Sequence, residues 1–221
     1  MAPESVPEWV RALALARDDD AVSSALQAGD PGAVDRALLY LETDRWGFRT
    51  GYVKQRLFRY LRHYELTHEQ RRRLHLVLVA CVDVGDRSEF GEACRCARRF
   101  EPDSLRDSLM YRFRSDDLGV SIRAMRMLTT LRHPRLSEDD RDHARDLLLV
   151  WASGPRVRYP ARWVSTVVRR LWASDWGEQL VAVAIAQPGT PRSHGARQLL
   201  VSVSRPRAVS DGPPAPNSSA P

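Results

Sequence analysis

The chain has 221 residues, of which 43% are hydrophobic, and its formal net charge is +6 at pH 7. This length suffices for one domain or two small ones, and the composition excludes collagen-like, disulfide-dense and wholly disordered classes. Three cysteines form an odd, sparse set that favours a reducing compartment. The longest apolar runs, Leu76–Val82 and Leu180–Ala186, are far shorter than the ~18 residues of a membrane span, and no signal-peptide pattern begins the chain. We therefore expect a soluble cytoplasmic protein without membrane insertion.

Apolar residues recur with a helical period along nearly the whole chain, and period-two alternation is almost absent. Asp, Pro and two capping boxes, Thr67 with Gln70 and Ser137 with Asp140, indicate where helices begin, and Gly or Pro indicates where they end. The expected helical segments are 7–16, 18–29, 31–43, 51–64, 67–84, 87–100, 102–113, 117–132, 137–152, 160–174, 175–186 and 191–203. The sequence thus predicts an all-α protein of about ten helices.

The chain changes character after residue 204. Residues 205–221 hold five prolines together with serine, alanine and glycine, and no aromatic residue. Such a segment cannot bury enough apolar surface to offset the entropy lost on ordering. We expect a helical domain over residues 1–204 and a disordered Pro/Ser-rich tail over residues 205–221.

Three segments share the pattern Asp-x-Gly-x4-Ala, beginning at Asp30, Asp117 and Asp175. Aspartate accepts backbone N–H bonds at a helix start, glycine permits a tight entry, and alanine two turns later lets a neighbouring helix approach closely. Helix pairs with such a pattern stack side by side, because one pair cannot bury its apolar face alone. The pattern indicates a weak internal repeat.

These residues resemble HEAT or armadillo-type helical repeats, with Asp117, Val120, Arg123 and Ala124 closest to the HEAT pattern. The resemblance covers residues 7–203 loosely. It implies an irregular α-solenoid of HEAT-like helix pairs whose extended surface binds a macromolecule. The copies lie 87 and 58 residues apart, whereas such repeats have a fixed period of about 40 residues. A closed irregular helical bundle is therefore the alternative fold.

The most basic stretch runs from Asp44 to His75, with nine lysines and arginines against three carboxylates. Arg56, Arg59 and Arg62 fall opposite the apolar stripe of their helix, so they should face solvent together. This pattern predicts a patch for phosphates or for an acidic protein. The alternative is an ordinary solvated face whose arginine stems cover the edge of the core.

A second stretch, Leu147–Ser174, contains no acidic residue and joins the first in one groove if the helices stack. Its alternative interpretation is a helix with Trp163, Val167 and Leu171 in the core. The partner-binding residues predicted from both stretches are Arg49, Tyr52, Lys54, Arg56, Arg59, Arg62, Arg156, Arg158, Tyr159 and Arg162.

Three other patterns suggest chemistry only weakly. The side chains of Cys94 and Cys96 would point in nearly opposite directions on a helix. The pair therefore fits buried apolar residues better than a metal site. Asp139, His143 and Asp146 share a helix face but lie in the first turns, where the helix dipole favours acids. No phosphate-binding loop, nucleophile elbow or metalloprotease motif is present. We predict no cofactor, no metal and no catalytic residue.

The segment from Trp172 to Trp176 allows one further alternative, because some DNA glycosylases built from HEAT-like repeats use tryptophans and an aspartate beside a damaged base. Here Asp175 is also explained as a helix cap. The leading interpretation is a non-catalytic interaction module or scaffold that presents an Arg-rich surface to an acidic protein. The alternative is a nucleic-acid-binding protein, including a glycosylase-type repair protein.

Overall fold

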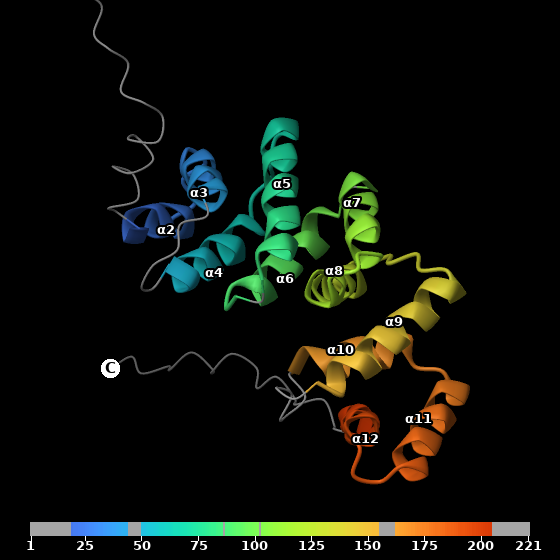
Figure 1. Ribbon diagram of the computed structural model, residues 1–221. Helices are drawn as coiled ribbons and strands as arrows, with labels where there is room; N and C mark the ends of the chain where they lie inside the picture. The colour runs from blue at the N-terminus through green and yellow to red at the C-terminus, as the bar shows by residue number, and fades with distance from the viewer. Residues whose placement is uncertain (1–18, 44–49, 86, 102, 155–161, 205–221) are drawn as a thin grey trace, which may run out of the picture. The chain divides into compact units, whose positions relative to one another are not determined.

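The computed structural model describes residues 19–43, 50–85, 87–101, 103–154 and 162–204 (Figure 1). In these residues the chain forms eleven helices and no strand, which confirms the predicted all-α class. The predicted helix 7–16 and the predicted tail 205–221 lie outside the described residues. The chain divides into two compact units, Met1–Trp151 and Ala152–Pro221.

Unit 1 contains helices α2 to α9, and each lies where the apolar periodicity and the start and stop signals predict a helix. Their bounds are α2 Asp19–Gln27, α3 Ala33–Glu42, α4 Thr50–Leu61, α5 His68–Val84, α6 Phe90–Phe100, α7 Asp103–Phe113, α8 Leu118–Thr130 and α9 Glu138–Ala152. Differences from the predicted bounds stay within about one turn, the usual uncertainty at helix ends.

Two predicted capping boxes are confirmed. The Thr67 hydroxyl accepts from the Gln70 backbone N–H at 3.2 Å, and the Gln70 side chain accepts from the Thr67 backbone N–H at 3.1 Å. Ser137 and Asp140 make the same reciprocal pair at 3.1 and 3.3 Å. At the other end of a helix, Gly29 follows α2 with φ +86°, a left-handed conformation that glycine adopts without strain.

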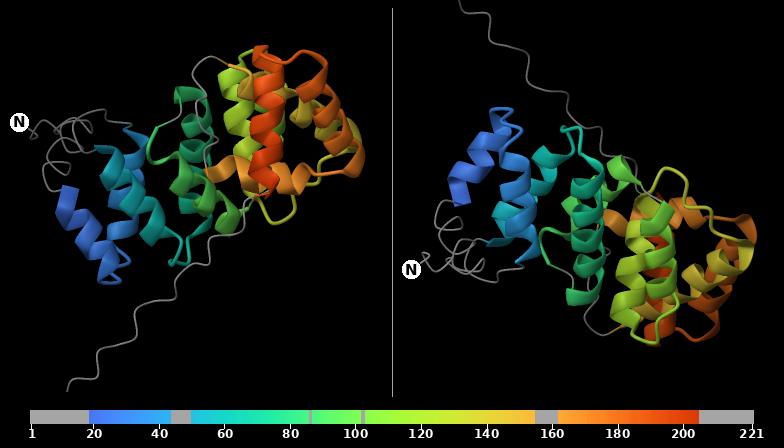
Figure 2. Two further views of the ribbon diagram at one scale, coloured as in Figure 1. Left: turned by 90° about the horizontal axis from the view of Figure 1, so that it is seen from below. Right: turned by 90° about the horizontal axis from the view of Figure 1, so that it is seen from above.

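Helices α2 to α8 are arranged in two layers (Figures 1 and 2). In one layer α2 packs on α4, α4 on α6, and α6 on α8. In the other, α3 packs on α5, and α5 on α7. Consecutive helices thus alternate between layers, and each helix buries its apolar stripe against helices of both. The fully buried Phe58, Phe90 and Phe113 lie in this core, where each contributes about 1.5–3 kcal/mol by leaving water.

The first two copies of the repeat pattern have the predicted local structure. Asp30 Oδ1 accepts from the backbone N–H of Gly32 at 2.8 Å. Asp117 Oδ1 likewise accepts from Gly119 N–H at 2.7 Å and caps α8. The alanines seven residues after each aspartate, Ala37 and Ala124, are fully buried, so neighbouring helices approach closely there.

Unit 2 contains α10 Arg162–Leu171, α11 Ser174–Ala186 and α12 Pro191–Ser204, with α12 packed against both others. The third copy of the pattern departs from the prediction. Asp175 is not a cap: α11 begins at Ser174 after Ala173, so the carboxylate already lies in the first turn. Ala182 is exposed rather than buried. The spacing is shared, but no helix packs against this side of α11 within the described part of unit 2.

Candidate functional site

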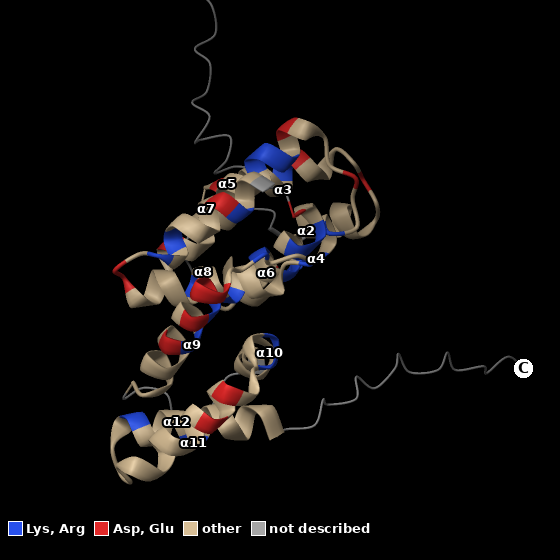
Figure 3. Cartoon of the chain, turned by 90° about the vertical axis from the view of Figure 1, so that its right-hand side faces the viewer, with Lys and Arg blue, Asp and Glu red and all other residues tan. Residues whose placement is uncertain are grey.

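Positive charge in unit 1 is concentrated in one of the two layers. Helices α4, α6 and α8 carry eight lysines and arginines but a single carboxylate, Glu92. Helices α3, α5 and α7 carry six arginines and six carboxylates. We call α4, α6 and α8 the basic layer, and α3, α5 and α7 the neutral layer; Figure 3 colours these charges. The neighbouring helix α2 adds Asp19 and Asp20 at its start.

The centre of the basic layer is a group of arginines around the Glu92 carboxylate. Arg59 of α4 donates to Glu92 Oε1 at 3.3 Å, and Arg95 of α6 donates to the same oxygen at 2.6 Å. Arg62 Nη2 lies 3.9 Å from Glu92 Oε2. The Glu92 side chain is only 9% exposed, whereas those of Arg59 and Arg95 are 50% and 60% exposed. One buried carboxylate therefore faces three guanidinium groups, two of which reach well into solvent.

The group continues onto α8 through Arg126. The Arg126 guanidinium lies 5.0 Å from the centroid of the buried Phe90 ring at the start of α6, a cation–π contact. It also lies beside Gly91, where an added Cβ would stand 3.5 Å from Arg126 Nη2. Gly91 and Arg95 are one helical turn apart, so Arg126 and Arg95 occupy the same side of α6. We name Arg59, Arg62, Arg95 and Arg126 the arginine cluster.

The chemistry of the cluster suits oxyanions. Each guanidinium has five N–H donors in a planar fork that matches carboxylate and phosphate oxygens. Glu92 uses one donor each of Arg59 and Arg95. Glu92 Oε2 accepts no hydrogen bond, although it is buried. Arg59, Arg62 and Arg95 thus bring three positive charges to one carboxylate, Glu92.

Five of the predicted partner-binding residues lie on α4 or directly after it. Arg59 and Arg62 belong to the arginine cluster. Tyr52 is exposed and Arg56 is half-buried. Lys54, the chain's only lysine, is only 3% exposed. It lies one turn before Phe58 on the inner side of α4, so it does not belong to the exposed surface.

The remaining predicted residues cannot be placed with their side chains. Arg49, Arg156, Arg158 and Tyr159 lie outside the described residues, and of Arg162 only its position at the start of α10 is described. The joining of the two basic stretches in one groove therefore stays a prediction.

Sequence reasoning missed Glu92, Arg95 and Arg126. The signal was present in the charge count of each helix, because α8 holds two arginines and no carboxylate, and α6 three arginines and one carboxylate. It was hidden because basic charge was sought in continuous stretches. Helices that share a layer alternate along the chain, so their charges are interrupted by the balanced helices α5 and α7.

A small cavity of about 200 Å³ lies between α3, α4, α5 and the start of α6. Its lining is mostly apolar and includes Phe58 and Val77, while Lys54 and Glu89 add charge, with Nζ 3.9 Å from the Glu89 carboxylate. Sites for drug-sized ligands usually measure about 300–1,000 Å³. The cavity is smaller than such a site, and its ion pair is accounted for as a contact between α4 and the start of α6.

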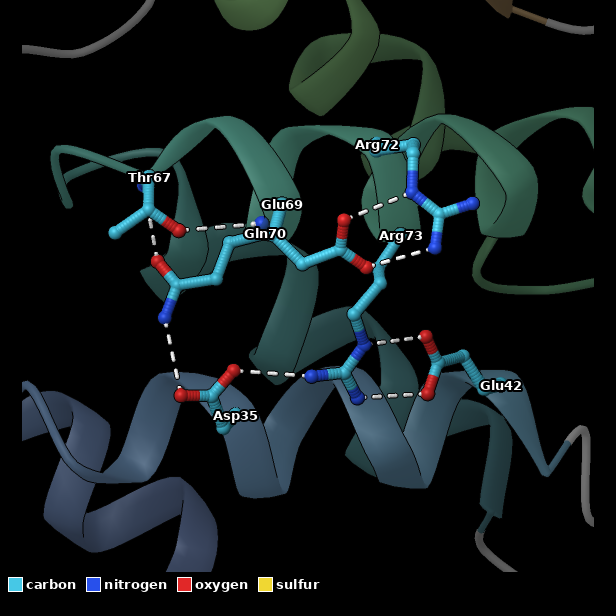
Figure 4. A network of polar contacts seen from close by, with 7 residues as sticks. All are labelled: Asp35, Glu42, Thr67, Glu69, Gln70, Arg72 and Arg73. Atoms are coloured by element: carbon cyan, nitrogen blue, oxygen red, sulfur yellow. Dashed lines mark hydrogen bonds and ion pairs between the residues drawn. The ribbon is translucent and has the colours of Figure 1, made fainter.

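Arginines of the neutral layer are matched by carboxylates, as a network between α3 and α5 shows (Figure 4). Arg73 donates to both oxygens of Glu42 at 2.7 Å and to Asp35 at 3.0 Å. Gln70 donates to Asp35 at 3.1 Å. One turn away, Arg72 pairs with Glu69 through two bonds of 2.8 Å. These contacts hold two helices of the layer together and leave little unmatched charge.

The weaker sequence patterns are accounted for structurally. Cys94 and Cys96 are buried, and burial raises the pKa of the Cys96 thiol to about 12. The His143 ring packs edge-on against Phe113 at 4.9 Å. Asp139 and Asp146 are exposed. Within the described residues, no group of three His, Cys, Asp or Glu side chains is placed to hold a metal ion.

The tryptophan pair of unit 2 is a packing feature. Trp172 lies edge-on to Trp176 at 5.7 Å, and its ring rests on Gly177, where an added Cβ would approach to 2.8 Å. Trp172 remains 38% exposed beside Val181 and Leu200 in an open apolar depression. Asp175 is exposed.

Comparison with known protein families, curated proteins and solved structures finds no match. No described helix is long and apolar enough to cross a bilayer.

Proposed function

We propose that the protein is a non-catalytic interaction module that binds an acidic macromolecule through the arginine cluster of unit 1. The observation that carries the proposal is the segregation of charge between the two layers: α2, α4, α6 and α8 hold eight cations and three carboxylates, whereas α3, α5 and α7 hold six of each. Balanced charge is expected where ion pairs only hold helices together. An excess confined to one layer destabilises that layer by repulsion unless a partner neutralises it.

We also propose that α2 to α8 form a short α-solenoid of the HEAT-like kind. Support comes from the alternation of consecutive helices between two layers and from the matched caps at Asp30 and Asp117. In such a stack, one layer presents a continuous surface made from every second helix. The arginine cluster spans three helices of one layer, as a surface of this type requires.

Binding would depend on guanidinium donors that are already held in place. The buried Glu92 carboxylate holds Arg59 and Arg95 through ion pairs, and the Phe90 ring contacts the Arg126 guanidinium. Less side-chain entropy is then lost when an anion binds, which favours affinity. Because the arginine heads are near solvent, the attraction is screened by salt, and the affinity should fall steeply as ionic strength rises.

The test compares two double variants of equal charge by fluorescence anisotropy with labelled polyglutamate at low salt. Arg59→Gln with Arg95→Gln removes two cations from the basic layer, whereas Arg36→Gln with Arg72→Gln removes two exposed cations from the neutral layer. We expect the first variant to lose about tenfold in affinity and the second less than about threefold. Equal losses would show that net charge alone drives binding, and no binding by the unmodified chain would refute the function.

Nucleic acid is the second candidate, because a layer with an excess of cations attracts any polyanion. Double-stranded DNA and single-stranded RNA of matched length belong in the same titration. A nucleic-acid partner predicts tighter binding than to polyglutamate and a log–log salt slope that rises with the number of phosphates contacted.

A further inference from the structure

If the arginine cluster binds an acidic macromolecule, as proposed above, the arrangement of three of its members restricts the anion further. Resting on that proposed function, we infer that Arg59, Arg62 and Arg95 together bind a phosphate monoester, carried by a phosphorylated side chain of a partner protein.

The three arginines converge on one point. Arg59 Nη2 and Arg95 Nη1 contact the same oxygen, Oε1 of Glu92, at 3.3 and 2.6 Å, so these two nitrogen atoms lie at most about 6 Å apart. Arg62 Nη2 lies 3.9 Å from the other oxygen of the same carboxylate. Charge-assisted N–H···O bonds are about 2.7–2.9 Å long, so donors this close together can bind the oxygens of a single anionic group. The arrangement therefore suits a compact anion with several oxygens.

Two of these arginines can be reached from solvent while they contact Glu92. The Glu92 side chain is 9% exposed, whereas those of Arg59 and Arg95 are 50% and 60% exposed. Arg59 contacts Glu92 through Nη2 and Arg95 through Nη1, and a guanidinium carries N–H donors on two further nitrogen atoms. A ligand oxygen can therefore bind both arginines while Glu92 keeps its place.

The charge of the group indicates which oxyanion fits. Three guanidinium groups and the Glu92 carboxylate have a net charge of two positive units. A phosphate monoester carries about −1.5 to −2 at pH 7 and has three acceptor oxygens, so one such group neutralises the excess and offers an oxygen to each arginine. A carboxylate brings one negative charge and two oxygens, and each phosphate of a nucleic-acid backbone also brings one charge. The monoester is thus the best match.

The openness of the site favours a protein as the carrier of the phosphate. Arg59 and Arg95 are about half exposed, and solvent and salt screen the attraction of such groups for a small free ion. A peptide adds contacts between its flanking residues and the neighbouring helices. Clusters of arginines are also a recurring means of recognising phosphorylated protein segments. A phosphopeptide should therefore bind much more tightly than inorganic phosphate.

An exposed aromatic residue distinguishes a phosphoprotein from single-stranded nucleic acid. Tyr52 is 68% exposed and lies seven residues before Arg59 on the same side of α4, a separation of about 10.5 Å along the helix. A single strand bound here would stack a base on this ring. A phosphorylated side chain held by Arg59 and Arg95 needs no contact with it, so Tyr52→Ala should leave phosphopeptide binding unchanged.

The experiment measures binding of labelled Ala/Gln peptides to the full chain by fluorescence anisotropy at low salt. Three peptides differ at one central residue, which is phosphotyrosine, sulfotyrosine or glutamate. The sulfate ester has the tetrahedral shape of the phosphate but one negative charge fewer. We expect the phosphotyrosine peptide to bind about tenfold tighter than either of the others. Inorganic phosphate, a short single strand of thymidines and phosphoinositide vesicles are titrated as alternative ligands.

Two double variants test the geometry at constant charge. Arg59→Lys with Arg95→Lys keeps both charges but removes the planar fork of donors. This variant should lose about fivefold in affinity for the phosphotyrosine peptide and keep its affinity for polyglutamate within about twofold. Arg36→Lys with Arg72→Lys makes the same replacement in the neutral layer and should change neither affinity.

Each result supports or overturns the inference. Equal affinity for the phosphotyrosine and sulfotyrosine peptides overturns the monoester. Inorganic phosphate or vesicles that bind as tightly as the phosphopeptide overturn the protein carrier, as does a tighter-binding single strand that loses affinity in Tyr52→Ala. The proposed function survives these results as long as polyglutamate binds, and it is refuted only if every anion fails. The peptide comparison uses the unmodified chain, so it decides the matter even if the double lysine variant unfolds, which circular dichroism would reveal.

Discussion

The two layers of unit 1 use the same residue type, arginine, for different purposes. In the neutral layer, Arg73 meets Glu42 and Asp35, and Arg112 donates to both oxygens of Asp83 at 2.7 and 2.8 Å. In the basic layer, three arginines share one carboxylate. The two layers therefore differ in how many carboxylates lie within reach of the arginines. Where each arginine has its own carboxylate, the ion pairs serve to hold helices together; where several share one, the layer has excess positive charge.

The largest effect on stability is expected from a carboxylate at the end of the basic layer. Glu101, directly after α6, accepts from the backbone N–H groups of Arg132 and His133 at 2.7 and 3.1 Å and from Arg106 at 3.0 Å. Both Glu101 and Arg106 are 12% exposed. Glu101→Ala should lower the free energy of unfolding by about 3 kcal/mol in a urea titration, because it removes the carboxylate beside the largely buried Arg106 and the acceptor of two backbone N–H groups.

The matched control is Glu69→Ala in the neutral layer. Glu69 pairs with Arg72, and both side chains are 60% exposed. Its loss should leave the free energy of unfolding nearly unchanged. Similar losses for the two variants would contradict the structural role given to Glu101.

A second prediction separates the layers directly. Arg73→Ala should cost about 1–2 kcal/mol of stability, because it breaks a two-oxygen pair with Glu42 and a bond to Asp35 while the arginine is half-buried. Arg95→Ala should cost less than about 0.5 kcal/mol and instead weaken polyanion binding. Thermal melts measure the stability of both variants, and anisotropy measures their binding to the polyanion. A greater loss of stability for Arg95→Ala than for Arg73→Ala would contradict the roles given to the two layers.

A smaller, pH-dependent effect is expected from the neutral layer. Burial, with the nearby Arg112 charge, lowers the pKa of His75, whose ring lies between Ser104 and Ser108. The unfolded chain then binds a proton at a higher pH than the folded chain does, so stability should fall as pH drops below about 6.5. His75→Gln should flatten this part of the stability curve. An unchanged slope in the variant would show that other groups cause it.

Acidic conditions should weaken the folded state through two carboxylates. Burial alone would raise the pKa of Glu101 and of Asp140, but hydrogen bonds from Arg132 and His133 at the first, and from Arg114 and Ser137 at the second, outweigh it, and both values are lowered. Their contribution is present above the unfolded values of about 4 and is lost as pH falls through the lower folded values. Unfolding curves between pH 3 and 5 should show less loss for Glu101→Gln than for the unmodified chain.

The smallest effect is chemical. Cys81 of α5 is half-buried, whereas Cys94 and Cys96 of α6 are buried. Burial holds the pKa of Cys96 near 12, which keeps the thiol protonated and unreactive. Alkylation followed by mass spectrometry should label Cys81 first and the α6 thiols only after unfolding. Early labelling of Cys96 would place it in a more open site than the structure does.

Much of the helical structure could be predicted because its signals are local. Thr67 with Gln70 and Ser137 with Asp140 lie three residues apart, so the caps are visible in the sequence. The failure at Asp175 is also local, because a fixed spacing does not show whether the helix begins before or after the aspartate. The prediction that Lys54 belongs to the exposed basic surface is wrong. It counted the charges along a continuous stretch and did not consider that a residue one turn before the buried Phe58 faces inward.

The sequence by itself determined the all-α class, the approximate helix bounds and the total excess of arginine. Only the tertiary structure decided which arginines meet carboxylates, because Arg59 and Glu92 are 33 residues apart, Arg73 and Glu42 are 31 apart, and Arg112 and Asp83 are 29 apart. Such pairs depend on how helices alternate between layers. Charge that forms a run along the chain is therefore divided between two layers, and charge that is scattered along the chain is brought together on one.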